Sequence, residues 1–166
     1  MQFTLIDRIT AITPNSSITA VKALSMAEDY LKDHFPRFPV MPGVLMLEAM
    51  FQTSAWLVRE SEDFKNTIVL LKEARNVKYA DFVSPGNILE ITAEIIKQDE
   101  NTTTLKTRGT INSSGENAVS AKLTLERYSL SDKNVENQAV DNFIRGKMRE
   151  QYSQLFRPDI AEATRS

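Results

Sequence analysis

The chain of 166 residues contains no cysteine and a single histidine, His34. The lack of cysteine excludes disulfides, thiolate metal sites and a cysteine nucleophile. With only one histidine, a structural zinc site is not expected either. His34 is therefore the chain's only imidazole for moving a proton near neutral pH.

The sequence also lacks a strong charge of either sign and any long apolar run. Its formal net charge is −2, which leaves no electrostatic footprint for nucleic acid or for an anionic membrane. No apolar run approaches the roughly 18 residues needed for a membrane span. Residues 1–8 show no basic segment followed by a long apolar core. We therefore expect no signal peptide and a cytoplasmic location.

The hydrophobic pattern indicates one early helix followed by several strands. A first strand is predicted over residues 18–24, after a turn at residues 14–17. Residues 44–59 are apolar nearly all round and contain neither proline nor glycine, which predicts a buried helix. Further strand patterns cover residues 68–79, 88–97, 103–111 and 118–128. This order predicts an α+β fold in which an antiparallel meander wraps a central helix.

The tail has a different pattern. Residues 131–138 are mostly polar, and apolar residues then recur at helical spacing until Pro158, namely Val140, Phe143, Ile144, Met148, Tyr152, Leu155 and Phe156. They predict an amphipathic helix of about 20 residues, with Arg145, Lys147 and Arg149 on or near its wet side. We expect a domain at residues 1–130 and a helical extension at residues 131–166. The extension either packs on the domain or an oligomer interface, or it acts as a lid or partner-docking element.

A stiff loop joins His34 to the predicted central helix. Pro36, Pro39 and Pro42 recur every third residue and bar a helix until the last of them, which suits a first helical turn. Gly43 lets a ligand approach the backbone closely. The free N–H groups and the positive dipole end at this helix start are suited to hold a carbonyl oxygen that gains charge.

An acid and an amide follow inside the helix. Glu48 and Gln52 are one turn apart on the same face, so Gln52 can donate a hydrogen bond to the carboxylate. Each feature alone has an ordinary structural explanation, since an acid in an apolar helix can be satisfied by backbone or amide groups. A base, a stiff loop, a glycine at a helix start, an acid and an amide in this order nevertheless predict a catalytic site.

The run from His34 to Gln52 resembles the active-site segment of the hot-dog-fold β-hydroxyacyl-acyl carrier protein dehydratases of fatty-acid synthesis. The family pattern has His-Phe-Pro, a spaced proline, Pro-Gly-Val-Leu, Glu-Ala-Met and a glutamine four residues beyond the glutamate, and it is met here. His34 and Glu48 keep the family spacing of fourteen residues. Residues 77–89 are similar to the family's second segment, a strand, a Pro-Gly turn and another strand. The likeness covers roughly residues 3–128.

The resemblance implies a hot-dog fold, in which two protomers join into one continuous sheet. It places a tunnel-like site at the dimer interface, with the histidine from one subunit and the glutamate from the other. By this likeness His34 takes the proton next to the thioester and Glu48 protonates the leaving hydroxyl, which gives a trans-2-enoyl thioester. The Gly43 N–H polarises the thioester carbonyl, and Gln52 orients Glu48.

The same likeness implies a substrate carried on the phosphopantetheine of acyl carrier protein, with no metal and no bound organic cofactor. Similar enzymes often assemble further, into a trimer of dimers. The expected tunnel residues are Val44, Phe51 and Trp56. Phe51 and Trp56 are bulkier than the small residues common in the family, so we expect them to shorten or redirect the tunnel.

Several alternatives remain open from the sequence. A dehydratase–isomerase is the lesser possibility, because that branch usually has aspartate where Glu48 stands. Specialised dehydratases of polyketide, aryl-polyene or lipid pathways share the motif. A thioesterase or hydratase on the same fold, or a non-catalytic acyl-binding protein, is disfavoured by the intact motif. Acyl length and pathway do not follow from the sequence.

Overall fold

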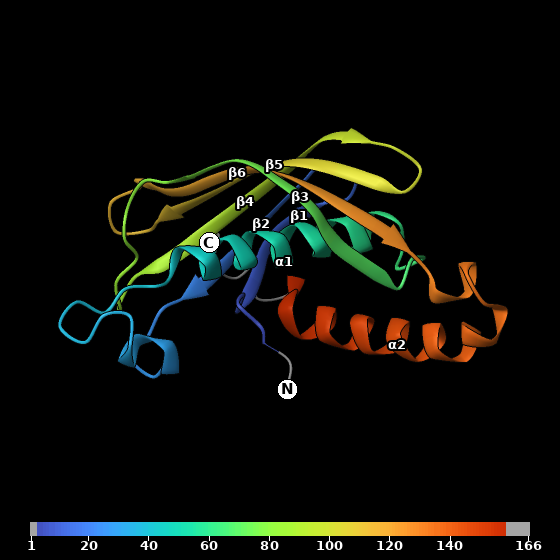
Figure 1. Ribbon diagram of the computed structural model, residues 1–166, viewed down its shortest axis with the longest axis horizontal. Helices are drawn as coiled ribbons and strands as arrows, with labels where there is room; N and C mark the ends of the chain where they lie inside the picture. The colour runs from blue at the N-terminus through green and yellow to red at the C-terminus, as the bar shows by residue number, and fades with distance from the viewer. Residues whose placement is uncertain (1–2, 159–166) are drawn as a thin grey trace.

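The computed structural model describes residues 3–158, which form one six-stranded antiparallel sheet curved around a long helix (Figure 1). The strand order across the sheet is β1-β2-β4-β5-β6-β3. The strands are β1 (Arg8–Thr13), β2 (Ser17–Ala23), β3 (Ile68–Tyr79), β4 (Ile88–Gln98), β5 (Thr102–Ile111) and β6 (Asn117–Tyr128). The helices are α1 (Gly43–Ser61) and α2 (Gln138–Leu155), with short 3-10 turns at Asp29–Lys32, Leu130–Asp132 and Val135–Asn137. The predicted α+β hot-dog architecture is confirmed.

The sheet differs from the prediction in two ways. β1 was not predicted, and the last four strands do not form a simple meander. β4, β5 and β6 follow one another, but β3 pairs with β6 at the far edge, with Leu71 opposite Leu125 and Tyr79 opposite Val119. The loop after β3 therefore crosses from that edge to β4, which pairs with β2. Alternation shows which residues of a strand face the core, but it does not encode which strand lies beside it.

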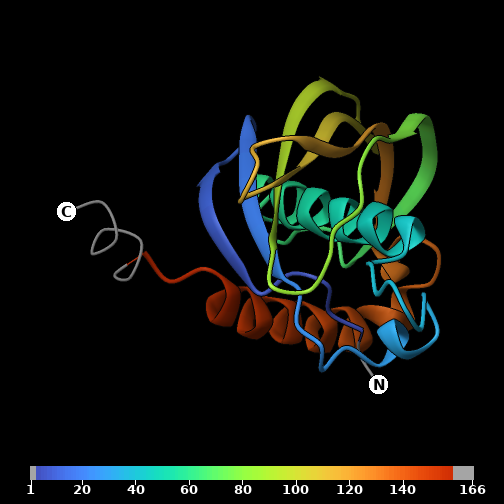
Figure 2. The same ribbon diagram turned by 90° about the vertical axis from the view of Figure 1, so that its left-hand side faces the viewer.

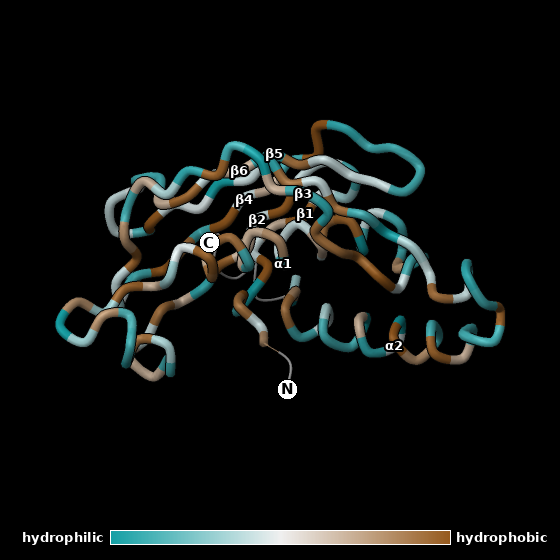
Figure 3. Tube along the Cα trace, viewed as in Figure 1, coloured by the Kyte–Doolittle hydropathy of each residue, from teal (hydrophilic) through white to brown (hydrophobic). Residues whose placement is uncertain are grey.

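The core lies between α1 and the concave face of the sheet (Figure 2). Met50 and Leu57 of α1 are fully buried, as are Ile91, Leu105 and Leu123 on the facing strands. The hydropathy colouring shows hydrophobic stretches along the strands and α1 (Figure 3). Strand residues alternate because successive side chains point to opposite faces, so one face of each strand supplies this core.

The central helix is longer than the predicted 44–59 and is not buried on all sides. Leu45, Leu47 and Phe51 are half-buried, and Val44 is 69% exposed. One side of α1 thus presents apolar side chains that its own sheet does not cover. Pro42 is the N-cap residue rather than part of the first turn, and its carbonyl oxygen accepts the first helical hydrogen bonds.

The second helix packs back on the domain, on the side of α1 away from the sheet (Figures 1 and 2). Its Tyr152 ring lies 6.0 Å from Trp56 and 5.6 Å from Phe64. Arg145 donates hydrogen bonds to the carbonyl oxygens of Phe64 and Lys65. Arg149 likewise bonds Asp63 at the end of α1. The arginines expected on the wet side of the helix therefore hold it to the loop that follows α1.

At the start of α2, the side that faces the protein differs from the predicted apolar side. Phe143 and Val140 are exposed, whereas Asp141 is fully buried. The Asp141 carboxylate accepts hydrogen bonds from the Thr67 hydroxyl and from the N–H groups of Leu130 and Ser131. Burial alone would raise the pKa of Asp141, but these hydrogen bonds hold it well below its usual range. A buried carboxylate thus decides which face of the helix turns inward.

Within residues 3–158, neither α1 nor α2 is long and apolar enough to cross a bilayer. The predicted extension continues to residue 166, and its last eight positions lie outside the described residues.

Candidate active site

His34 lies in the proline-stiffened loop just before α1. Its backbone N–H donates to Tyr30, and its carbonyl oxygen accepts from Val40. Phe35 and Phe38 bond each other through their backbones, which closes the loop tip. The His34–Phe35 peptide bond is cis, and the two rings stack with their centroids 4.2 Å apart. These contacts, rather than a regular element, hold the half-buried imidazole in place.

One hydrogen bond assigns the proton on the imidazole. Nδ1 of His34 lies 3.0 Å from the carbonyl oxygen of Val40. A carbonyl oxygen can only accept, so Nδ1 is the donor and carries the proton. The Nε2 of the neutral ring is then unprotonated and can act as a base.

Gly43 begins α1 close beside the end of β3. Helix geometry leaves its N–H without an intrahelical acceptor. A Cβ at this position would lie 2.9 Å from Cε1 of Tyr79, closer than side-chain carbons pack. The glycine therefore lets the Tyr79 ring cover the helix start. Met41, two residues earlier, donates its N–H to the carbonyl oxygen of Val83 in the loop after β3.

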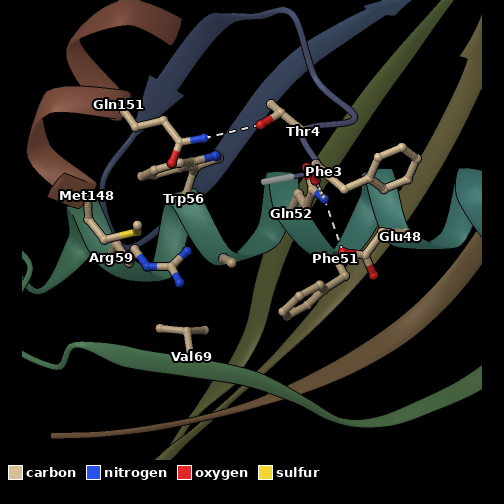
Figure 4. A pocket seen from close by; sticks show the side chains of 11 residues that line it. Phe3, Thr4, Glu48, Phe51, Gln52, Trp56, Arg59, Val69, Met148 and Gln151 are labelled. Atoms are coloured by element: carbon tan, nitrogen blue, oxygen red, sulfur yellow. Dashed lines mark hydrogen bonds between the residues drawn. The ribbon is translucent and has the colours of Figure 1, made fainter. Parts of the chain in front are cut away.

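Glu48 lies one and a half turns into α1 and is half-buried. Nε2 of Gln52 donates to Oε1 of Glu48 over 3.1 Å (Figure 4). Gln52 is itself held by the segment before β1, because its Nε2 also donates to the Phe3 carbonyl oxygen and its Oε1 accepts from the Leu5 N–H. The Gln52 side chain therefore links the Glu48 carboxylate to residues 3–5, which are far from it in sequence.

A pocket of about 210 Å³ opens beside this carboxylate. One face of α1 supplies most of its wall, with Glu48, Phe51, Gln52, Ala55, Trp56 and Arg59. Phe3 and Thr4 close one side, and Val69 of β3 lies across from them (Figure 4). Met148 and Gln151 of α2 form the end that is farther from Glu48.

The predicted residues fall into two groups. Glu48, Gln52, Phe51 and Trp56 line the pocket. Their roles as an acid, its amide partner and two tunnel residues stay predictions. Among the described residues, His34, Gly43 and Val44 are not part of its lining. They lie before or at the start of α1. Exposed aromatic rings lie beside two of them, since Phe35 stacks on His34 and Tyr79 lies against Gly43. Within this chain, His34 thus lies outside the pocket that Glu48 lines.

Sequence reasoning missed Arg59 and the contribution of α2. Arg59 follows Glu48 by eleven residues, about three helical turns, so the helical period places both on one face. That spacing was available as a signal. Met148 was expected on the apolar face of the tail helix, but a helix pattern does not show what the face packs against.

Within residues 3–158, no cluster of three or more histidine or acidic side chains could hold a metal ion.

Comparisons with known proteins identify the class. Residues 1–122 match the family described as a FabA-like domain. The "3-hydroxyacyl-[acyl-carrier-protein] dehydratase FabZ" of Rickettsia rickettsii (strain Sheila Smith) is 42% identical over 123 residues, covering 74% of this chain and 83% of that protein. The protein of the same description from Levilactobacillus brevis is 35% identical over 128 residues, covering 76% and 84%.

Solved structures agree on the fold. The dehydratase heterocomplex ApeI:P from Xenorhabdus doucetiae matches with a TM-score of 0.60 at 17% identity, covering 77% of this chain and 85% of that one. The smu.793 protein of Streptococcus mutans UA159, bound to acetyl CoA, matches with a TM-score of 0.61 at 12% identity, covering 78% and 94%. Fold and site motif define a hot-dog-fold dehydratase class. Within it, the chain belongs to the FabA-like family, and the resemblance noted from the sequence is confirmed.

Proposed function

We propose that this protein dehydrates 3-hydroxyacyl thioesters carried by acyl carrier protein to trans-2-enoyl thioesters, as an enzyme of fatty-acid or related acyl-chain synthesis. The observation that carries the proposal is the hydrogen bond from His34 Nδ1 to Val40, because it leaves Nε2 free as a base. The relatives from Rickettsia rickettsii and Levilactobacillus brevis, both named as 3-hydroxyacyl-[acyl-carrier-protein] dehydratases, support the same reaction.

The proposed step balances with side chains alone. His34 Nε2 removes a proton from the carbon next to the thioester, and the electron pair forms the new double bond. The hydroxyl leaves the next carbon as water after Glu48 gives it a proton. His34 ends protonated and Glu48 ionised, and exchange with solvent resets both. Gly43 N–H binds the thioester oxygen as charge develops there, and Gln52 orients Glu48.

We also propose that the working unit is a homodimer with shared sites. β3 is an open sheet edge, and its Leu70, Leu71 and Tyr79 side chains are 47%, 37% and 49% exposed. An unpaired, partly apolar edge favours pairing with a second strand. Val44 and the uncovered side of α1 support the same interface, where a partner's His34 would meet this chain's Glu48. A trimer of dimers stays a prediction from family resemblance.

The remaining expectations join this proposal. Acyl carrier protein is the partner that presents the substrate, and the chemistry above uses no metal or bound cofactor. A cytoplasmic location stays a prediction from the sequence. Domain limits at residues 130 and 131 stay a prediction as well, although α2 is packed against the first part.

The test is an assay with crotonyl and 3-hydroxybutyryl thioesters of acyl carrier protein, followed spectrophotometrically in both directions. Wild type should interconvert them, and His34→Ala and Glu48→Gln should each lose at least about 10²-fold in rate. Glu116→Gln, at an exposed carboxylate in the β5–β6 turn, is the matched control and should retain the rate. A wild type that is inactive on short and medium chains alike would refute the dehydratase proposal.

A further inference from the structure

Arg59 faces the same pocket as the proposed acid, at its other end (Figure 4). Eleven residues at about 1.5 Å each separate the two Cα atoms by roughly 16 Å along α1. Ala55 lies between them on the same face and leaves the pocket open along the helix. Helical side chains lean towards the N-terminus, so the guanidinium of Arg59 reaches back towards Glu48.

The guanidinium of Arg59 has no polar partner among residues 3–158. Its Nε is buried and makes no hydrogen bond, and its one specific contact is the Trp56 ring, 5.2 Å from Cζ to the centroid. Glu62 is the acidic residue whose charge acts on Arg59, but its carboxylate is already bound by Arg127 and Asn66. Burial lowers the pKa of Arg59 to about 10, with Glu62 acting in the opposite direction, so the group stays cationic at neutral pH.

An unpaired buried donor is costly, and most such groups in proteins have a partner. The Nε atom itself is closed to water, but the Arg59 side chain lines the pocket, so it is the cation that an acceptor bound there would meet. Met148 and Gln151 of α2 form the wall beside Arg59, and Gln151 is held by a 3.4 Å hydrogen bond to Thr4. An alkyl chain that reached this end would remove water from the cation and supply no acceptor in return.

We infer that Arg59 selects acyl groups that end in a carboxylate. In this arrangement, the carbons next to the thioester react beside Glu48, and the far end of the acyl chain accepts hydrogen bonds from the Arg59 guanidinium. A terminal carboxylate fits there, because its planar shape matches the donors of the guanidinium. An extended chain advances about 1.2 Å per bond. After allowing for the length of the arginine side chain, about eight carbons span the pocket. The inference rests on the proposed dehydratase function and names its substrate class.

The experiment compares two 3-hydroxyacyl substrates of equal length, about eight carbons, carried on acyl carrier protein. One ends in a methyl group and the other in a carboxylate, and kcat/KM is measured for each. We expect wild type to prefer the carboxylate by at least about tenfold, since a charge-assisted pair is gained. Arg59→Met should reverse that preference. Arg108→Met, at an exposed arginine on β5, is the matched control and should keep the wild-type ratio.

Two outcomes would overturn the inference. One is a wild type that prefers the methyl-ended substrate or does not distinguish the two, a result that needs no variant to fold. The other is a folded Arg59→Met protein that keeps the wild-type ratio, as it would if a partner subunit neutralised Arg59. The 3-hydroxybutyryl substrate is too short to reach Arg59. Activity on it therefore tests the dehydratase proposal independently of the inference about Arg59. If wild type fails on it and on both longer substrates, the dehydratase proposal itself falls.

Discussion

The Nδ1 atom of His34 donates a hydrogen bond to the carbonyl oxygen of Val40 over 3.0 Å, and this contact closes the loop that leads into α1. It gives the imidazole one tautomer and one orientation before any substrate binds. Glu48, one and a half turns into the same helix, is held in a comparable way by Gln52. Each proposed catalytic group thus has its own positioning partner.

Subunit mixing should reveal whether the site is shared. If His34 and Glu48 act from different subunits, a mixture of His34→Ala and Glu48→Gln chains should regain activity. Half of randomly paired dimers are mixed, and each has one of two sites intact, so about a quarter of wild-type activity is expected. The measurement is the crotonyl hydration rate after the two variants are unfolded and refolded together. A site built within one chain would stay inactive in every combination.

Removing the amide of Gln52 should lower kcat more than it changes KM. Gln52→Leu leaves the carboxylate of Glu48 without its donor, and it also frees Phe3 and Leu5. We expect kcat to fall about tenfold, equivalent to about 1.4 kcal/mol of activation free energy. Steady-state kinetics and the pH profile of kcat measure the effect. Gln98→Leu at the exposed end of β4 is the control, and equal losses in both variants would argue against a positioning role.

A methyl group at position 43 should disturb the helix start through Tyr79. The new Cβ of Gly43→Ala would lie 2.9 Å from the ring, so the ring or the helix must move. We expect a loss of about 1 kcal/mol in the free energy of unfolding, typical of overpacking, together with reduced activity. The double variant with Tyr79→Ala removes the clash and should recover most of the stability. Urea unfolding measures both, and no recovery would mean that the strain lies elsewhere.

Asp141 should make the docking of α2 depend on pH in the acid range. Its pKa is lower in the folded protein than the value of about 3.9 expected when unfolded. Its stabilisation is therefore complete above about pH 4 and is lost as the pH falls towards the folded pKa. Asp141→Asn should lower Tm by several degrees at neutral pH, and the gap from wild type should narrow below about pH 4.

Thermal unfolding at several pH values tests this expectation. Glu150→Gln, at a carboxylate on the exposed face of the same helix, is the control and should change Tm little at any pH. A gap between wild type and Asp141→Asn that is the same at pH 7 and at pH 3 would contradict the assignment.

The sequence by itself determined the chemistry-bearing segment. His34, Gly43, Glu48 and Gln52 are close along the chain, and helical period alone places the last two on one face. The central helix, the one strand predicted before it and the four predicted after it also follow from local periodicity, because that pattern depends only on residues close along the chain. A resemblance carried by that segment was enough to identify the family.

Only the tertiary structure decided which distant segments complete the pocket. Phe3, Val69 and Met148 lie far from Glu48 in sequence, yet all line the same space. β3 lies at the open edge of the sheet beside β6 and not beside β4, which follows it in sequence. In α2, Asp141 is buried and Met148 lines the pocket, whereas Phe143 is exposed. Periodicity records which residues avoid water, whereas their neighbours depend on packing and hydrogen bonds between segments that only the folded chain brings together.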